Sequence, residues 1–168
     1  MREAADRLYH RAQKLATTYR ERNAPRILAL LEEAAEFEHP EALFELGSWR
    51  HHGIGAERDD ARAAHFWERA SACGHVEARF LLAIACERGL GVSRDAGRAF
   101  ELYESCAALG HPGALYECGR CHYYGLGTSV DREAAAEFFT SARAQGHPEA
   151  NADAAESDGP RRMPRPNW

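Results

Sequence analysis

The run Cys118-Gly-Arg-Cys121-His122 holds the residue types in this chain that are best suited to chemistry. Two thiols followed by an imidazole match the pattern that attaches a c-type haem. The same residues suit a redox-active thiol pair, or a zinc site together with Cys86, because side chains three and four residues apart share one face of a helix. A thiol/haem or zinc-binding redox protein that uses Cys118, Cys121 and His122 is therefore one hypothesis for the function.

Histidines also recur at a fixed interval of 36 residues, and a histidine series is a common source of metal ligands. They are His39, His75, His111 and His147. One imidazole per interval, about a helical hairpin from the next, cannot close a single coordination shell, so we interpret these residues as polar groups at helix junctions. Because paired carboxylates and a nucleophile motif are also missing from the sequence, we expect no metal, no cofactor, no catalytic residue and no enzymatic activity.

The histidine spacing belongs to a longer internal repeat of the same period. Each full copy places an alanine three residues after the histidine, then a Gly-x-Gly, an aspartate four residues later, an apolar pair and a closing glycine. In the first copy these are Ala42, Gly53-Ile-Gly55, Asp59, Phe66-Trp67 and Gly74. A copy of this length is one helix-turn-helix unit. Such a unit cannot bury its apolar stripe alone, so the copies are expected to stack.

The first copy predicts one helix from Pro40 to His52 and a second from Asp60 to Ala72. Glycine ends the first helix because it adopts the left-handed conformation without a side-chain clash, and an aspartate can accept hydrogen bonds at the start of the second. Cys118 and Cys121 then fall inside the first helix of the third copy, with no strand before them. We therefore interpret both as small buried residues, which disfavours the redox and zinc hypotheses.

Each copy resembles the Sel-one-like repeat (SLR), and in the first copy the matching residues are Ala42-x3-Leu46-Gly47-x5-Gly53-x-Gly55-x3-Asp59-x3-Ala63-x2-Phe66-Trp67-x2-Ala70-x3-Gly74-His75. The match recurs three times, and its period differs from the 34 residues of the tetratricopeptide repeat (TPR). The resemblance implies an all-α fold, a right-handed α-solenoid of helix-turn-helix (SLR/TPR-like) repeats. It also implies a non-catalytic adaptor or scaffold for a peptide or helix of a partner protein, including a subunit or assembly factor of a larger complex.

The resemblance also divides the chain into segments. We expect a degenerate N-terminal capping helix pair (1–38), three repeats (39–74, 75–110 and 111–146), a partial helix of a fourth repeat (147–156) and a disordered or partner-bound tail (157–168). The chain departs from the family pattern at Ala83, where glycine is usual, and at Arg50, Cys86 and His122, which replace a common aromatic residue. These departures concern the packing of the first helix of each repeat.

The outward face of each first helix is the expected partner-binding surface, because these helices line the concave side of stacked hairpins. Leu81 and Ile84 make the middle copy apolar there, within a charged rim that suits a peptide or helix. The expected groove consists of Glu45, Trp49, His52, Leu81, Ile84, Arg88, Glu117, Arg120 and Tyr124. The alternative is that these positions belong to the core. Two further contact surfaces are the open C-terminal edge at Ala150 and a docking motif in the tail formed by Arg161, Arg162 and Trp168.

Charge and hydropathy exclude several other partners. A net charge of −5 and a pI near 6.0 disfavour nucleic acid and anionic membranes. No stretch approaches the roughly 20 apolar residues of a membrane span, so direct membrane insertion is not expected. The absence of a secretory signal pattern and the odd number of five cysteines predict a cytoplasmic location. The mitochondrial matrix is the alternative, because the N-terminal segment is amphipathic and fairly rich in arginine.

Overall fold

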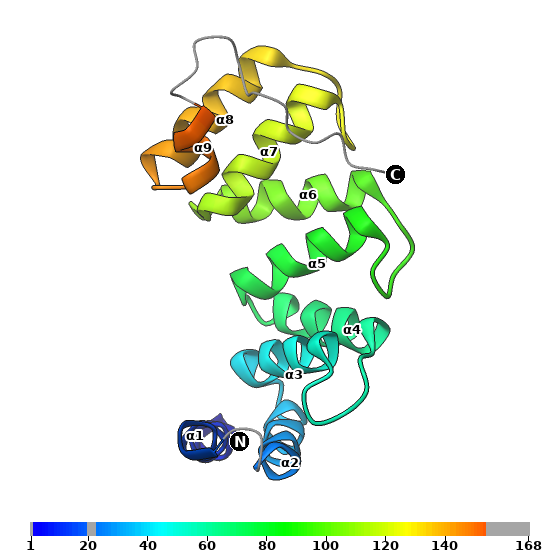
Figure 1. The fold of residues 1–168 in the computed structure, drawn as a ribbon, viewed down its shortest axis with the longest axis vertical. Coiled ribbons are helices and arrows are strands. Elements are labelled where there is room, and N and C mark those ends of the chain that lie inside the picture. The colour runs from blue at the N-terminus through cyan, green and yellow to red at the C-terminus, as the bar shows by residue number, and fades with distance from the viewer. Residues whose placement is uncertain (1, 20–22, 154–168) are drawn as a thin grey trace. The chain divides into compact units, whose positions relative to one another are not determined.

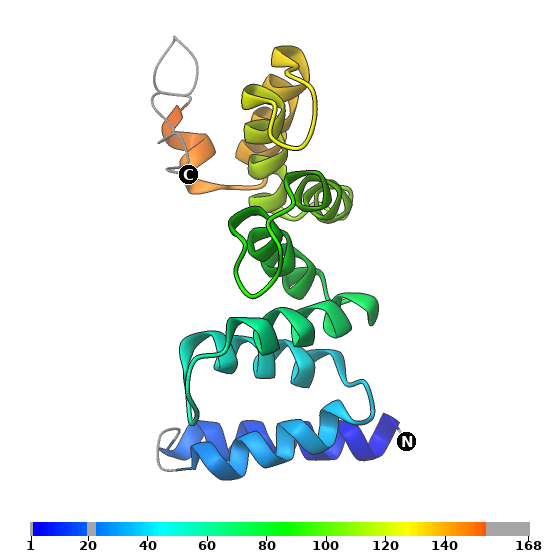
Figure 2. The ribbon, with the colours of Figure 1, turned by 90° about the vertical axis from the view of Figure 1, so that its right-hand side faces the viewer.

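The computed structural model describes residues 2–19 and 23–153, and within these ranges the regular structure is α-helical throughout (Figures 1 and 2). The helices are α1 (Arg2–Tyr19), α2 (Ala24–Ala35), α3 (Pro40–His52), α4 (Asp60–Ala72), α5 (Val76–Arg88), α6 (Ala96–Ala107), α7 (Pro112–Tyr124), α8 (Arg132–Ala144) and α9 (Pro148–Asp153). The chain divides into two compact units, residues 1–102 and 103–168, with the boundary inside α6.

Helices pack in chain order within each unit. In the first unit α1 packs on α2, α2 on α3, α3 on α4, and α4 on α5; in the second, α7 packs on α8 and α8 on α9. In Figure 2 the α3/α4 pair lies above the α1/α2 pair. The predicted helical hairpin is therefore the packing element of both units.

The helices of the first repeat begin and end where the sequence predicts, at Pro40–His52 and Asp60–Ala72. Gly53 ends α3 in the left-handed conformation, with φ of 67°. The side chain of Asp59 accepts a hydrogen bond from the backbone N–H of Arg62, which satisfies one of the free donors at the start of α4. Local backbone preferences therefore set both helix bounds.

Three of the four recurring histidines, His39, His75 and His111, cap the helices that follow them. In each, the imidazole accepts a hydrogen bond at Nδ1 from the backbone N–H three residues on, which is the role usually filled by serine, aspartate or asparagine. The Nδ1 to N distances are 3.3 Å for His39 to Ala42, 3.2 Å for His75 to Ala78 and 3.1 Å for His111 to Ala114. The predicted junction position is confirmed, and the capping bond supplies its physical reason.

Small residues pack against large ones inside each hairpin. A Cβ added to Gly47 would lie 2.4 Å from the indole ring of Trp67, and one added to Gly119 would lie 2.7 Å from the ring of Phe139. Glycine at these positions therefore lets an aromatic ring of the second helix rest directly on the backbone of the first. Small residues therefore meet large ones within the hairpin and keep its two helices closely packed.

Residues 2–35 form a helix pair without the Gly-x-Gly turn. The stripe residues Ala5 and Ala12 of α1 are each only 1% exposed, and Leu31 of α2 is completely buried. Proline lies in the first turn of α2, where its missing backbone donor is not needed. A capping role for this pair stays a prediction. The tail residues Arg161, Arg162 and Trp168 lie outside the described residues.

Candidate partner-binding surface

A pocket of about 370 Å³ opens between α1 and α3 in the first unit. Its lining consists of Gln13, Ala16, Thr17, Phe44, Glu45, Ser48 and Trp49. Two of these residues, Glu45 and Trp49, belong to the groove predicted from the sequence. The pocket therefore lies on the predicted face of α3, with α1 as its second wall.

Glu45 organises the polar side of this pocket. Its carboxylate accepts hydrogen bonds from the hydroxyl of Tyr9, at 3.0 Å, and from the side-chain amide of Gln13. Burial and the neighbouring Glu45 carboxylate raise the pKa of Tyr9 to about 12, so the hydroxyl remains a donor at physiological pH. The polar wall is thus pre-arranged by contacts between α1 and α3.

Trp49 lies deeper than predicted. Only 2% of its surface is exposed, so it forms the base of the pocket instead of an accessible partner-binding side chain. Trp49 follows the fully buried Leu46 by three residues, and residues three apart share one face of a helix. Of the two interpretations that the sequence leaves open for this position, groove or core, the burial of Trp49 supports the core.

The remaining predicted residues of the first unit lie at the surface to different degrees. His52 and Arg88 are exposed at the ends of α3 and α5. Leu81 and Ile84 are half-buried on α5, whereas the adjacent Leu82 is only 3% exposed. Leu81 and Ile84 thus lie between the core and the surface, and their place in the groove stays a prediction.

In the second unit, the predicted residues are on α7, where Glu117 and Arg120 already contact each other. The Nε atom of Arg120 lies 2.6 Å from a carboxylate oxygen of Glu117, and both side chains are largely buried. Tyr124 is half-buried, with its ring edge-on to Tyr123 at 4.9 Å between ring centroids. This ion pair and this ring pair are held in place by neighbours on α7 itself.

The contribution of α1 to the pocket was not predicted, although the sequence holds a signal for it. Extending the 36-residue period backwards from Glu45 and His52 leads to Tyr9 and Ala16. Tyr9 bonds to Glu45, and Ala16 lines the pocket. The period therefore continues into the N-terminal helix even though the Gly-x-Gly signature does not.

The thiols of the redox hypothesis are buried in the second unit. Cys118 is completely buried and Cys121 is 3% exposed. Burial, with smaller contributions from Cys121 and nearby carboxylates, raises the pKa of Cys118, whereas a reactive thiol needs a lowered pKa. His122 stacks on Phe138 at 5.6 Å between centroids. These contacts are those of core residues and give no support to the redox hypothesis.

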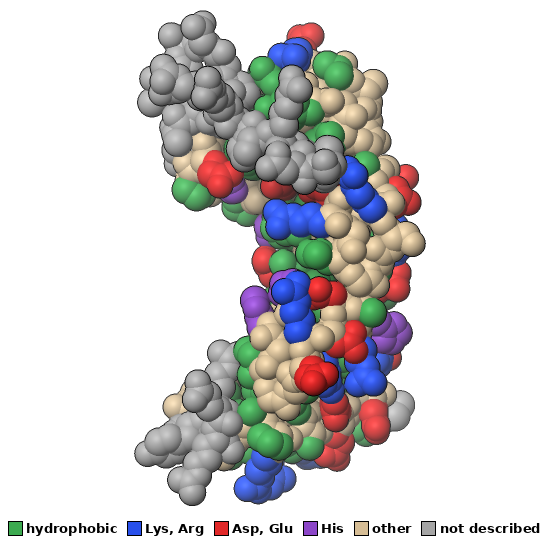
Figure 3. All heavy atoms as spheres, turned by 45° about the vertical axis from the view of Figure 1, so that its right-hand side comes forward, with side chains coloured by type: hydrophobic (Ala, Val, Ile, Leu, Met, Phe, Trp, Pro, Cys, Tyr) green, Lys and Arg blue, Asp and Glu red, His purple; other side chains and the backbone are tan. Residues whose placement is uncertain are grey.

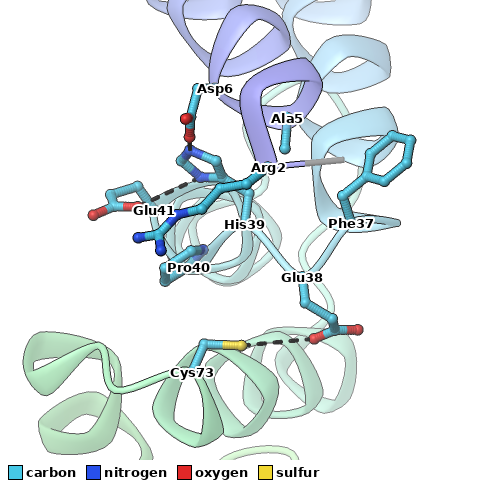
Figure 4. A pocket seen from close by; sticks show the side chains of 9 residues that line it. All are labelled: Arg2, Ala5, Asp6, Phe37, Glu38, His39, Pro40, Glu41 and Cys73. Carbon is cyan, nitrogen blue, oxygen red and sulfur yellow. Dashed lines mark hydrogen bonds and ion pairs between the residues drawn. The ribbon is translucent and has the colours of Figure 1, made fainter.

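A second pocket of the first unit, also about 370 Å³, surrounds the junction of α2 and α3 (Figure 4). The Nε2 atom of His39 lies 3.2 Å from a carboxylate oxygen of Asp6, and its Nδ1 atom lies 3.4 Å from one of Glu41. The Sγ atom of Cys73 lies 3.8 Å from a carboxylate oxygen of Glu38. Burial, together with this carboxylate, raises the pKa of the Cys73 thiol. The site is polar, but its thiol is not activated as a nucleophile.

Acidic and basic side chains are interspersed on the face drawn in Figure 3, and neither sign forms a continuous patch among the residues described there. Among the described helices, none is both long and apolar enough to cross a membrane. Within the same ranges, no group of three or more His, Cys, Asp or Glu side chains is arranged to hold a metal ion.

Solved structures with the same fold come from several bacteria. A protective antigen of uropathogenic Escherichia coli strains, which displays an SLR fold, is 28% identical with a TM-score of 0.71; the match covers 76% of this chain and 27% of the antigen. A Sel1 repeat protein from Oxalobacter formigenes is 22% identical with a TM-score of 0.76, and the match covers 87% of this chain and 59% of that protein. An immunity protein from Pseudomonas aeruginosa is 26% identical with a TM-score of 0.59, and the match covers 90% of this chain and 56% of the immunity protein.

This chain thus spans between 27% and 59% of the length of these three structures. No curated protein matches it. The likeness confirms the predicted fold class, an α-solenoid of helical hairpins.

The Sel1 repeat model matches residues 40–75, 76–111 and 112–147. Each matched segment begins at the first residue of α3, α5 or α7, directly after a capping histidine. Together the three segments make up well over half of the chain, and their hairpins, glycine caps and aromatic packing are those described above. The chain therefore belongs to the Sel1 repeat family.

Proposed function

We propose that this protein is a non-catalytic adaptor that holds a peptide or helix of a partner protein on the outward face of its first helices. Proteins with Sel1 repeats generally mediate protein–protein interactions and are typically non-catalytic. The observation that carries the proposal is the α1/α3 pocket, which combines a pre-arranged carboxylate at Glu45 with an apolar base at Trp49. Pockets with a buried apolar base and a few fixed polar groups are typical of binding sites.

Residues of α5 and α7 extend the proposed surface in each unit. In the first unit, Leu81 and Ile84 offer half-buried apolar area, and Arg88 offers an exposed charge. In the second unit, Glu117, Arg120 and Tyr124 offer a mixed polar and aromatic face on α7. Half-exposed apolar and aromatic side chains bordered by charges are the usual composition of peptide-binding surfaces.

Site-specific photo-cross-linking tests this surface directly. A benzophenone side chain placed at Ser48, which lines the pocket, should cross-link to the partner in cells. The same group at His65, an exposed residue of α4 outside the pocket, is the matched control and should give no such adduct. Equal adducts from both positions, or none from Ser48, would argue against the pocket as the binding site.

Substitution of the partner-facing residues gives an independent test. Ile84→Ala and Arg120→Ala should each weaken capture of the cross-linked partner by about tenfold if these residues are central contacts. Both variants should keep the helical circular dichroism spectrum of the unmodified chain, and Arg120→Ala should also lower the melting temperature, because it removes the ion-pair partner of the Glu117 carboxylate. Unchanged capture by both variants would remove α5 and α7 from the proposed surface.

Two further parts of the proposal concern the C-terminal region and the compartment. We propose that the open edge at α9, or the tail with Arg161, Arg162 and Trp168, contributes a contact to the partner. Deletion of residues 157–168 should then weaken partner capture, and unaltered capture would rule the tail out. A cytoplasmic location is proposed from the odd number of cysteines and is testable by fractionation of the native host.

A further inference from the structure

A pocket of about 300 Å³ lies between α1 and α2 in the first unit. It is lined by Ala4, Arg7, Leu8, Arg11, Glu33 and Phe37, and we call it the α1–α2 groove. Tyr9 and Gln13 of α1 point to α3, as their bonds to Glu45 show. Successive helical residues are about 100° apart, so Arg7 and Arg11 lie on the opposite side of α1. The groove is therefore separate from the α1/α3 pocket.

The two arginines of this groove have no partner among the residues that the structure describes. Neither Arg7 nor Arg11 makes a hydrogen bond or ion pair with any described residue, and both are exposed. Two other arginines of the first unit do bind carboxylates, Arg50 with Glu32 at 2.9 Å and Arg69 with Glu38 at 2.6 Å. Two unpaired guanidinium groups one helical turn apart are suited to carboxylates, because each can bind one in a bidentate manner.

The groove also has an apolar centre. Phe37, directly after α2, is 41% exposed and is one of the few large apolar side chains exposed in the described part of the chain. Ala4 and Leu8 lie beside it, half-buried, and complete the lining. An exposed aromatic ring next to a shallow apolar floor is the kind of feature on which a partner's apolar side chain packs.

We infer that the α1–α2 groove binds an acidic amphipathic segment of a partner protein. An apolar side chain of that segment packs on Phe37 and Leu8, and its carboxylates pair with Arg7 and Arg11. Glu33 lines the same groove and repels carboxylates, which directs them towards the two arginines.

The charges on the two sides of Phe37 differ, and this difference decides on which side an acidic segment can bind. On its other side, the pocket of Figure 4 carries the carboxylates of Asp6, Glu38 and Glu41 against a single arginine, Arg2, and the Phe37 ring is turned away from His39 there. That side therefore repels an acidic segment. An anionic membrane is disfavoured as the occupant of the groove because a broad surface would approach these carboxylates together with the two arginines, whereas a single segment can contact the arginines alone.

Fluorescence anisotropy with two designed peptides tests this inference on the full chain. The first peptide is a labelled helical 16-mer with leucines four residues apart and glutamates on both sides of them. The second peptide carries lysine in place of every glutamate. The acidic peptide should bind at least about tenfold more tightly than the basic one, with an affinity that falls as salt rises. Equal binding of the two peptides overturns the inference.

Variants of the groove sharpen the test. The double variant Arg7→Glu, Arg11→Glu and the single variant Phe37→Ala should each weaken binding of the acidic peptide by about tenfold or more. Glu33→Gln should strengthen it by about twofold, because a repelling charge is removed. Arg26→Glu changes an exposed arginine of α2 outside the groove and should leave the affinity unchanged.

Three results contradict the inference. The first is an unchanged affinity in the double arginine variant. The second is co-sedimentation of the chain with phosphatidylserine vesicles that requires both arginines, which would indicate a membrane instead. The third is self-association without peptide that the double variant abolishes, which would indicate a second copy of the chain.

This inference goes beyond the proposed function, since it concerns the opposite side of α1. The two can fail separately. Ile84→Ala should leave binding of the acidic peptide unchanged, and the double arginine variant should leave the Ser48 cross-link unchanged.

Discussion

At the scale of single residues, the glycines inside α3 and α7 show how closely the two helices of a hairpin approach. Glycine in a helix interior costs roughly 1 kcal/mol relative to alanine, so a stable helix would normally avoid it. Gly47 and Gly119 are retained because the rings of Trp67 and Phe139 occupy the space that a Cβ would need. Packing across the hairpin thus outweighs local helix propensity at these two positions.

The contrast between two helical glycines makes this testable. Gly47→Ala should lower the free energy of unfolding by about 1–2 kcal/mol, because overpacking exceeds the gain in helix propensity. Gly97→Ala in α6 is the matched control, because the nearest atom, a carboxylate oxygen of Asp95, lies at an ordinary 3.5 Å. It should be neutral or stabilising by less than about 1 kcal/mol. Urea unfolding of both variants checks this, and a destabilised Gly97→Ala variant would contradict the explanation.

The burial of the cysteines also makes a residue-scale prediction. In the native protein, only Cys73 should react with a thiol reagent such as DTNB, because the other four cysteines are buried. All five should react after unfolding in denaturant. A Cys73→Ser variant should show no thiol reaction before unfolding. A thiol that does react in the folded variant, mapped to Cys118 or Cys121, would support the redox hypothesis.

At the scale of elements, the Gly-x-Gly turn has two distinct functions. Its first glycine ends a helix in the left-handed conformation, with φ of 67° at Gly53 and 71° at Gly89. Its second glycine touches the preceding hairpin, since a Cβ on Gly91 would lie 2.0 Å from the carbonyl oxygen of Asp60 at the start of α4. The turn therefore both reverses the chain and joins successive hairpins.

Two alanine substitutions separate these effects. Gly91→Ala should lower the free energy of unfolding by about 2 kcal/mol or more, because it adds a clash with the backbone to the strain of a positive φ. Gly74→Ala carries the same kind of strain, with φ of 89°, but nothing lies within 4 Å of the added Cβ. Its expected cost is only about 1 kcal/mol. Equal losses in thermal or urea unfolding would show that the close approach at Gly91 is unimportant.

At the scale of the whole molecule, the capping histidines link stability to pH. A protonated imidazole cannot accept the capping hydrogen bond, so the cap at the start of α5 favours the neutral form of His75. Burial is the largest cause that lowers the pKa of His75, and it also lowers the pKa of His147, whose Nδ1 makes no capping bond to a described residue. A group whose pKa is lower in the folded state takes up its proton more readily after unfolding, and acid then favours the unfolded chain.

Stability should therefore change little between pH 7 and pH 8 and fall as the pH drops below about 6.5, the ordinary pKa of histidine, until His75 and His147 are themselves protonated in the folded chain. Urea unfolding between pH 8 and pH 5 measures this. His75→Asn should show a smaller fall, because asparagine caps a helix without titrating in this range. His65→Asn, an exposed control on α4, should keep the full fall. A pH dependence identical in both variants would contradict the capping mechanism.

The sequence alone determined the period, the hairpin, the bounds of α3 and α4, and the left-handed helix ends, because these depend on local backbone preferences and on helical spacing. It left three features to the tertiary structure. They are the burial of Trp49, the wall that α1 adds to the pocket beside Glu45, and the contact of Gly91 with α4. Each depends on how one helix lies against another, and helical spacing gives only the face of a side chain, not the residue that meets it.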